Sequence, residues 1–428
     1  MHLLALNLPD LFVPLWHGTL RCEPGDDKAN WPWAVLKGDV WKCHGETVAN
    51  TTPYLPGSFD RPPRNPVEKI SSRYKSWEYT LWLIAMGPAL LYGVLPDKYW
   101  RHFCKLVYGI RIMSQRSISV SELQFAHAAI LEFVYDFEAL YYQRKISRLH
   151  MVRPSIHGLA HMGPETTRIG PLIGCSQYPM ERLIGDLGGE VRQPSNPFAN
   201  LSQRGLLRSQ TNALKAMVPG LDCSDRLVRG AVNLGDNYVL MHARDKYARV
   251  PRQCELLAVH RYYEEAGSNE RPEKIFRWAR LSLPTGQVAR SAWKERPKPL
   301  RKLRTARNVK LHFQGSVRFA EVLYYLILTV NDVDHYVAVV CLYSLPDPRL
   351  LAESHQTFLS CTHLGDDSPV IVDVKDIKSV VAMIPHPAAV GNEPIKRWFV
   401  AEKPGLDISM MQGGREADTE GAHDDNNE

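Results

Sequence analysis

The sequence lacks the features that mark several common classes of protein. Its 428 residues include eight cysteines, and no two of them form a Cys-x-x-Cys pair. The longest apolar stretch, residues 79–95, is broken by Gly87 and Pro88 and falls short of the roughly 20 residues that a membrane-spanning helix needs. The first residues do not have the basic-then-apolar order of a secretory leader. We therefore expect an intracellular protein with reduced thiols and no membrane segment.

The chain as a whole also lacks a strong excess of either positive or negative charge. The formal net charge is +6 at pH 7, while 23% of the residues are charged and 44% are hydrophobic. A small basic excess is compatible with a nucleic-acid partner but is common in proteins that have none, so its distribution matters more than its total. The length and the apolar fraction are sufficient for two or three domains with ordinary cores.

The N-terminal half has the apolar periodicity of helices. Helices are predicted, from apolar residues at three-and-four spacing, over residues 31–47, 66–86, 96–113, 119–143, 154–165, 179–191 and 200–217. Pro9 favours the start of an earlier helix. Ser119 and Glu122 have the spacing of a capping box. The apolar stripe that follows, from Leu123 to Tyr141, predicts core packing rather than ligand binding.

The pattern changes beyond this helical region. Residues 219–311 are polar with only short apolar pieces, which predicts an irregular basic linker. Residues 312–402 are strand-like and rich in valine, isoleucine, tyrosine and phenylalanine, with 331–334 as a hairpin turn. Residues 403–428 are acidic and poor in apolar side chains, as in a disordered tail. The expected fold class is α+β, with a mainly helical region over 1–218 followed by a small antiparallel β-rich domain.

One short segment concentrates positive charge. In WKERPKPLRKLRTARNVK, eight cations accompany a single acid, Glu295; they are Lys294, Arg296, Lys298, Arg301, Lys302, Arg304, Arg307 and Lys310. Clustered cations displace condensed counterions from a nucleic-acid backbone, and such clusters also serve as nuclear-localisation signals. The alternative is a solvated linker whose charge only keeps it soluble. The sequence leaves both interpretations open.

A second pattern is compatible with a metal ion. His157, His161 and Glu165 lie four residues apart, so one continuous helix would place all three on one face, as a metal site requires. Pro164 lies within this pattern, so the helix has to end or kink near it. The alternative is a packed, hydrogen-bonded pair of histidines, which is the commoner outcome for this spacing.

Glu181 begins a third pattern. Pro179 favours a helix start, which places Glu181 in the first turn, where its charge meets the positive end of the helix dipole. This is a sufficient structural reason for a glutamate at that position. Arg182, Arg192 and Arg204 give the same segment positive charge.

The stretch HGLAHMGPETTRIGPLIGCSQYPMERLIGDLGGEVRQPSNPFANLSQRG resembles the domain that follows the catalytic core in transposases of the CACTA (En/Spm) superfamily, especially the fungal branch. That family has a His-x-x-x-His helix, a Gly-Pro step, and an aromatic-Pro-Met-Glu-Arg helix start before further Arg, Asn and Ser positions. The residues that fill this pattern are His157, His161, Gly170, Pro171, Tyr178–Arg182, Gly185, Arg192, Asn196 and Ser202. The resemblance spans most of residues 1–217, and the C-terminal β-rich part is similar to the region that ends the same fungal proteins.

The resemblance implies the remnant of an RNase H-like core with a helical insertion, and DNA strand transfer as the ancestral activity. In that family, two aspartates and a glutamate hold two Mg²⁺ or Mn²⁺ ions that activate water or a DNA 3′ hydroxyl. It makes Glu181 the candidate third acid. It also makes His2, in the leucine-rich start MHLLALNL, the candidate end of an Asp-x-x-His step, so both aspartates would lie before Met1.

We therefore expect a nuclear, transposase-derived protein whose ancestral partner is transposon-end DNA. Without both aspartates, the chain is expected to have no cleavage activity, no cofactor and no small-molecule substrate. Arg182, Arg192 and the eight cations of residues 294–310 are the expected DNA contacts. One alternative is a domesticated, non-catalytic DNA- or chromatin-binding protein, and another is a metal hydrolase built on His157, His161 and Glu165.

Overall fold

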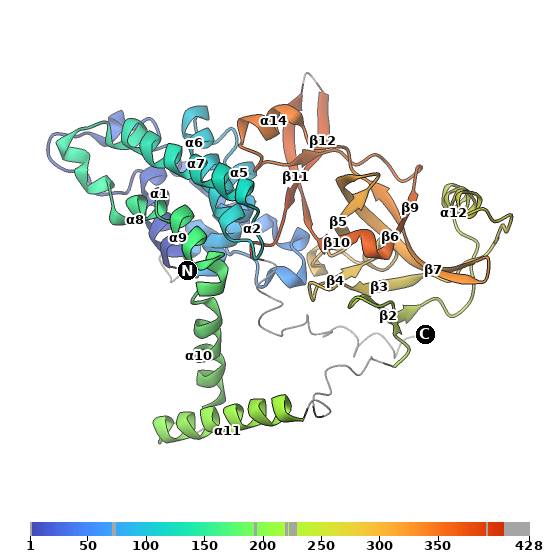
Figure 1. The fold of residues 1–428 in the computed structure, drawn as a ribbon. Coiled ribbons are helices and arrows are strands. Elements are labelled where there is room, and N and C mark those ends of the chain that lie inside the picture. Colours follow the sequence, from blue (N-terminus) through green and yellow to red (C-terminus); the bar gives the residue numbers. More distant parts are fainter. Residues whose placement is uncertain are drawn as a thin grey trace.

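The computed structural model describes residues 2–70, 74–191, 195–218, 221, 229–390 and 393–405. Helices form the N-terminal half and an antiparallel sheet lies in the C-terminal part, which confirms the expected α+β class (Figure 1). The helices are α1 (Leu8–His17), α2 (Gly38–Asn50), α3 (Pro66–Lys69), α4 (Ser76–Tyr79), α5 (Gly87–Leu90), α6 (Asp97–Met113), α7 (Val120–Phe137), α8 (Pro154–Leu159), α9 (Met162–Ile169), α10 (Tyr178–Glu190), α11 (Pro197–Met217), α12 (Gln253–Glu265), α13 (Ala292–Glu295) and α14 (Pro348–Glu353).

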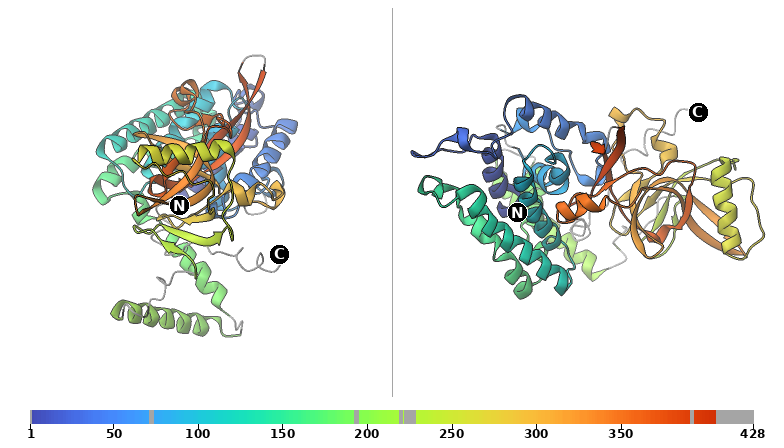
Figure 2. Two further views of the ribbon diagram at one scale, coloured as in Figure 1. Left: turned by 90° about the vertical axis from the view of Figure 1, so that its right-hand side faces the viewer. Right: turned by 90° about the horizontal axis from the view of Figure 1, so that it is seen from above.

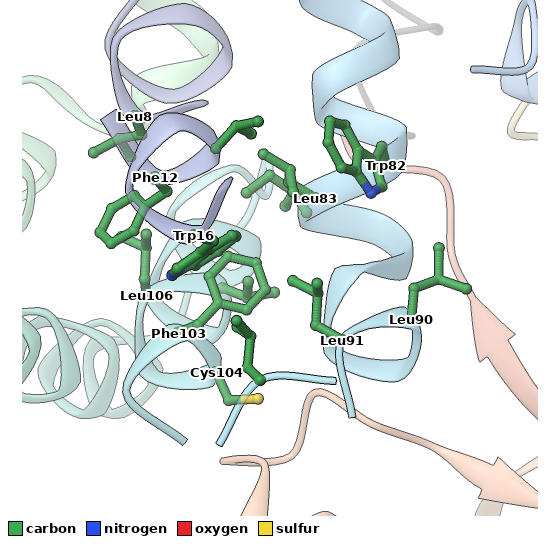
Figure 3. Packing of buried hydrophobic residues seen from close by; sticks show 14 of the residues in the cluster. Leu8, Phe12, Trp16, Trp82, Leu83, Leu90, Leu91, Phe103, Cys104 and Leu106 are labelled. Carbon is green, nitrogen blue, oxygen red and sulfur yellow. The ribbon is translucent and has the colours of Figure 1, made fainter. Parts of the chain in front are cut away.

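Aromatic side chains fill the core of the helical half. Figure 3 shows Phe12 and Trp16 of α1 beside Phe103 of α6, with the Trp16 and Phe103 rings meeting edge to face at 5.2 Å between centroids. Trp16 also donates a hydrogen bond from Nε1 to the hydroxyl of Tyr141 (3.2 Å). Burial of such large rings dominates core energetics, and edge-to-face pairs are favoured by their quadrupoles. This packing fixes α1 against α6 and α7.

The start of α7 confirms the predicted capping box. The Ser119 hydroxyl accepts a hydrogen bond from the Glu122 amide (3.2 Å), and the Glu122 carboxylate accepts one from the Ser119 amide (2.8 Å). Tyr141 is fully buried, as the core interpretation of this stripe predicts. Other predicted helices are divided: residues 66–86 form α3, α4 and a π-helical segment, Thr80–Met86.

The described strands form two antiparallel sheets. They are β1 (Val232–Asn233), β2 (Val239–Arg244), β3 (Trp278–Ser282), β4 (Val288–Arg290), β5 (Asn308–Phe313), β6 (Ser316–Val330), β7 (Val333–Leu342), β8 (Ser360–Cys361), β9 (Val370–Asp373), β10 (Ile377–Val380), β11 (Ala382–Val390) and β12 (Glu393–Ala401). Among the described residues, a nine-stranded sheet has the order β1-β2-β3-β6-β5-β10, with β4 on β3 and with β7 between β6 and β9, and a three-stranded sheet has the order β11-β12-β8.

The hairpin between β6 and β7 confirms the turn predicted at residues 331–334. Val330 pairs with Val333, which leaves Asn331 and Asp332 as the two turn residues. Both have positive φ values, 51° and 62°. A type I′ turn requires this backbone conformation at both positions, and asparagine and aspartate tolerate it better than most residues.

The predicted irregular linker over 219–311 is wrong for its described part, 229–311. That range contains β1 to β4 and most of β5, all within the nine-stranded sheet, together with α12. These strands are only two to six residues long, so each offers too few positions for a clear apolar alternation in the sequence. The expected boundary at residue 312 also fails, since it cuts through β5.

The hairpin of β11 and β12 joins the two parts of the molecule (Figures 1 and 2). Ile384 and Phe399 belong to the core cluster of the helical half, whereas Met383 and Val400 pack with residues of the nine-stranded sheet. Successive side chains of a strand point to opposite faces, so one hairpin serves both cores. Arg111 of α6 adds a link, because its guanidinium donates to the carbonyl of Thr357 (2.9 Å).

Helices α10 and α11 extend away from the rest of the helical half (Figure 1). No residue of α11 is buried. None of the helices in the described part of the chain has the length and apolar character that crossing a bilayer requires. Most of the predicted acidic tail, residues 406–428, lies outside the described residues.

Candidate nucleic-acid interface

The basic segment, residues 294–310, runs from α13 into β5 beside the helical half. The Thr305 amide donates a hydrogen bond to the carbonyl of Pro53 (2.9 Å). The Arg304 guanidinium donates to the carbonyls of Leu55 (2.6 Å) and Pro56 (2.7 Å). Lys310 forms an ion pair with Glu402 at 2.9 Å. The segment is therefore part of the folded structure, and some of its cations hold that structure together.

Two further cations of the segment contact a buried carboxylate on β6. Glu321, only 5% exposed, accepts from Nε of Arg307 (2.5 Å) and from Nη2 of Arg296 (2.5 Å). Arg307 also pairs with buried Glu295 (3.3 Å), and Arg296 with Asp366 (2.6 Å). Buried charges are costly unless they are paired, so these arginines complete the fold.

The pKa of Glu321 reflects this environment. Burial acts to raise it, but hydrogen bonds from His363 and Arg296 and the charges of Arg296 and Arg307 outweigh burial and lower the pKa to about 2. The opposite result holds for Glu295, whose pKa is raised because burial dominates over its hydrogen bond from the Ala306 amide and the nearby arginines. Glu321 is therefore an ionised carboxylate held by cations.

Glu321, His363 and Asp366 also form the one group of three metal-type ligands within 4.8 Å of each other in the described part of the chain. These residues do not fit a metal ion. The Arg296 guanidinium already donates hydrogen bonds to both carboxylates, and its positive charge would repel a metal cation at the same place. His363 accepts from the Gly365 amide at Nδ1 (3.1 Å), so its Nε2 carries the proton that faces Glu321.

The remaining cations of the segment face solvent, and we call them the exposed basic loop: Lys294, Lys298, Arg301 and Lys302. Within the described residues, Lys294, Arg301 and Lys302 have no carboxylate partner. Lys294 lies 4.5 Å from the ring centroid of Trp293. Because both ends of the loop are anchored, by buried Ala292 and Thr305, the four charges are presented from a fixed base.

Glu181 lies in the first turn of α10, where the sequence placed it. Its amide donates to the Gln177 carbonyl (3.0 Å) and the residue is exposed. It does not belong to the three-ligand group above, and neither does His2, which is exposed just before the helical turn Leu3–Asn7. The side chain of Arg182 and the whole of Arg192 lie outside the described residues.

The two histidines of the second pattern come together, but the glutamate does not join them. Nε2 of His157 lies 3.0 Å from Nε2 of His161. The helix breaks between α8 and α9, and Glu165, in the first turn of α9, pairs with Arg168 (2.5 Å). Pro164 accounts for the break, because a proline has no amide hydrogen to donate and its ring clashes with the carbonyl four residues earlier, which lies between α8 and α9. These residues form a hydrogen-bonded pair, without the three protein ligands that zinc sites usually have.

Sequence reasoning missed the acids that hold the basic segment. Glu321 lies 25 residues from Arg296, and Asp366 lies 70 residues from it. One signal was available: Glu321 is the single acid in the apolar run RFAEVLYYLILTV. A carboxylate in a buried strand needs a cationic partner, and the basic segment is the nearest cluster of cations in the sequence.

Comparisons with known proteins returned no match: no family model, no curated protein and no solved structure is similar to this chain.

Proposed function

We propose that this chain is a CACTA-type, transposase-derived protein that binds duplex DNA through the exposed basic loop and does not cleave it. The observation that carries the proposal is the division of the basic segment. Arg296 and Arg307 are paired with acids of the protein, whereas Lys294, Arg301 and Lys302 are exposed and have no carboxylate partner among the described residues. The transposase descent rests on the resemblance described above.

A fixed cluster of cations supports phosphate binding for two reasons. Each lysine or arginine that neutralises a phosphate releases condensed counterions, which makes binding favourable and dependent on salt. The loop is also held by its flanking residues, so little backbone order has to be gained on binding. Contacts of this type position a protein on DNA without reading its sequence. The same cations are of the kind that nuclear import recognises, so the proposed location is the nucleus.

The absence of cleavage is proposed from the positions of the acids. Two-metal strand transfer needs several carboxylates that converge on one pair of ions. Among the described residues, Glu181 has no such neighbours, and Arg296 occupies the one three-ligand group. We therefore propose that the described residues of this chain do not build a strand-transfer site.

The test is the affinity of the full chain for a labelled DNA duplex, measured by fluorescence anisotropy. In one variant, glutamine replaces all four cations of the exposed basic loop. In a matched control, glutamine replaces four exposed cations elsewhere, namely Arg144, Lys145, Arg261 and Lys274. Loss of phosphate contacts predicts affinity at least about tenfold weaker in the first variant and nearly unchanged in the control. Equal affinities in both variants would overturn the proposed interface.

Cleavage is tested separately with supercoiled plasmid, Mg²⁺ or Mn²⁺ and the full chain. We expect no nicked or linear product. A product that is formed by the full chain and lost in Glu181→Gln would contradict the proposal and restore Glu181 as a catalytic acid.

A further inference from the structure

Helix α11 has an apolar side that no other part of the described chain covers. Leu206, Leu207, Leu214 and Met217 are 52–79% exposed. At 100° per residue these four side chains lie within one side of the helix. Single apolar residues are normal on a protein surface, but a contiguous row of them marks a contact with another molecule.

The charges of α11 are all positive. Its 21 residues include Arg204, Arg208 and Lys215 but no aspartate or glutamate. Arg204 lies three residues before Leu207, so it flanks the apolar side. Arg208 pairs with Glu190 at the end of α10, which ties the two helices together. The surface that fits α11 is therefore apolar and flanked by acidic side chains.

Helix α7 has such a surface on its outer side. Phe125, Ala128, Leu131 and Tyr135 follow one another at three-and-four spacing and are all exposed. This spacing places them in one row along the helix. The other side of α7 packs into the core of the helical half. The row is therefore a second apolar face that the described chain leaves uncovered.

The charges of α7 are all negative. Its 18 residues include Glu122, Glu132 and Asp136 but no lysine or arginine, and exposed Glu138 follows directly. Lys105 of α6 lies 2.9 Å from both Glu132 and Asp136, and its charge offsets one of the four. The outer side of α7 is therefore apolar with a negative surplus, the complement of α11.

The two faces lie apart within one chain. Helix α10 carries α11 away from the helical half that contains α7 (Figure 1). With 13 residues, α10 is about 20 Å long. The partner that offers α11 an acidic, apolar helix is then a second copy of the same chain.

We propose that the chain forms a dimer in which α11 of each copy packs on α7 of the other. Reciprocal exchange covers both apolar faces of each chain and closes the assembly at two copies. With about half of each helix facing its partner, each copy contributes roughly 20 residues, as stable interfaces do. This inference does not depend on duplex binding by the exposed basic loop.

The test is the mass of the full chain by sedimentation velocity, with two variants that reverse the charge of one face. The α7 variant combines Phe125→Lys and Tyr135→Lys, and the α11 variant combines Leu207→Glu and Leu214→Glu. All four side chains are exposed, so the fold should persist, and circular dichroism checks this. The full chain is expected to be a dimer. Each variant alone is expected to dimerise at least about tenfold more weakly, because like charges then meet in both contacts.

Mixing the two variants tests which helices meet. In the mixed dimer, lysines on α7 of one copy face glutamates on α11 of the other, and the second contact is unchanged. The mixture is therefore expected to dimerise at least about tenfold more tightly than either variant alone. The matched controls replace Tyr247 and Val250, exposed apolar residues elsewhere, by two lysines or by two glutamates, and both should dimerise as the full chain does.

Three results would overturn the inference. They are a full chain that stays monomeric, a variant that dimerises alone as the full chain does, and a mixture that gains nothing over its components. If the full chain is monomeric, flotation with vesicles of phosphatidylcholine and phosphatidylserine shows whether the basic helix α11 binds a lipid surface instead. None of the four substitutions lies in the exposed basic loop, so failure of the dimer leaves the proposed DNA contact untouched.

Discussion

Residues 294–310 contain two sets of cations with opposite surroundings. Arg296 and Arg307 contact Glu321, a carboxylate buried in a strand, whereas Lys294 and Arg301 have no carboxylate partner among the described residues. The two sets are indistinguishable by composition, since both are basic residues of one short segment. The difference shows that the cations paired with acids of the protein have to be identified first. Only the remaining cations of a basic run can then be assigned to a ligand.

The helical half contains the same contrast. Arg148, 1% exposed at its side chain, bonds both oxygens of Asp26 at 2.7 Å, and Asp26 is 4% exposed. Arg153 also pairs with an aspartate at 2.7 Å, but Asp10 in that pair is 74% exposed. The two ion pairs therefore have equal distances but very different degrees of burial. The burial determines how much the loss of each arginine would cost in stability.

The largest expected effect is from breaking the buried pair of the helical half. Arg148→Met leaves the Asp26 carboxylate buried without its cationic partner, which is expected to lower the free energy of unfolding by about 3–5 kcal/mol. Urea unfolding measures this loss. Arg153→Met removes the exposed pair and should cost less than about 1 kcal/mol. Similar losses in the two variants would contradict the distinction between buried and exposed cations.

A smaller loss is expected in the basic segment. Arg307→Met removes hydrogen bonds to Glu321 and Glu295, both nearly buried, while Arg296 still pairs with Glu321. We expect the free energy of unfolding to fall by about 3 kcal/mol, measured in urea. Lys294→Met, at an exposed position of the same segment, is the control and should change it by less than about 0.5 kcal/mol.

Acid should weaken the fold in two stages. Burial lowers the pKa values of His44 and His102 from 6.5 to about 4, so the unfolded chain binds more protons between these limits and stability falls as the pH drops through this window. The pKa of Glu321 falls from 4.5 to about 2, so its contribution is present above pH 4.5 and is lost as the pH approaches 2.

For Glu321, this linkage amounts to about 2 kcal/mol lost between neutral pH and pH 3. The measurement is the free energy of unfolding against pH for the full chain and for Glu321→Gln. The variant is expected to have a shallower decline below pH 4.5. Glu270→Gln, at an exposed glutamate, should keep the original slope; the same slope in all three proteins would show that Glu321 is not the titrating group.

The smallest effect on stability is expected from the exposed basic loop. In the exposed-loop variant, the changes at Lys294, Arg301 and Lys302 remove no contact with a carboxylate among the described residues, and Lys298 is replaced at an exposed position. The free energy of unfolding should therefore change by less than about 1 kcal/mol in urea. A loss comparable to that of Arg307→Met would mean that the loop belongs to the fold.

Long and regular elements were predictable from the sequence. The helix predicted over 96–113 forms α6 (Asp97–Met113), and the turn at 331–334 separates β6 and β7. Both depend on local patterns, an apolar stripe and a two-residue turn. The short strands before β5 were missed because each has only two to six residues, which is too few for a clear alternation of apolar and polar side chains.

The candidate site was only half predictable for a related reason. The sequence identified the cations of 294–310 but could not divide them, because Glu321 and Asp366 reach Arg296 only through the fold. It placed Glu181 correctly in a first helical turn, which is a local feature.

The most direct test of the account is the salt dependence of duplex-DNA affinity for the full chain, the exposed-loop variant and the control with four cations changed elsewhere. Four phosphate contacts predict that the slope of log affinity against log salt is shallower by about 3–4 in the loop variant. The control is predicted to keep the original slope. A loop variant that folds normally and keeps the original slope would contradict the claim that these cations bind DNA.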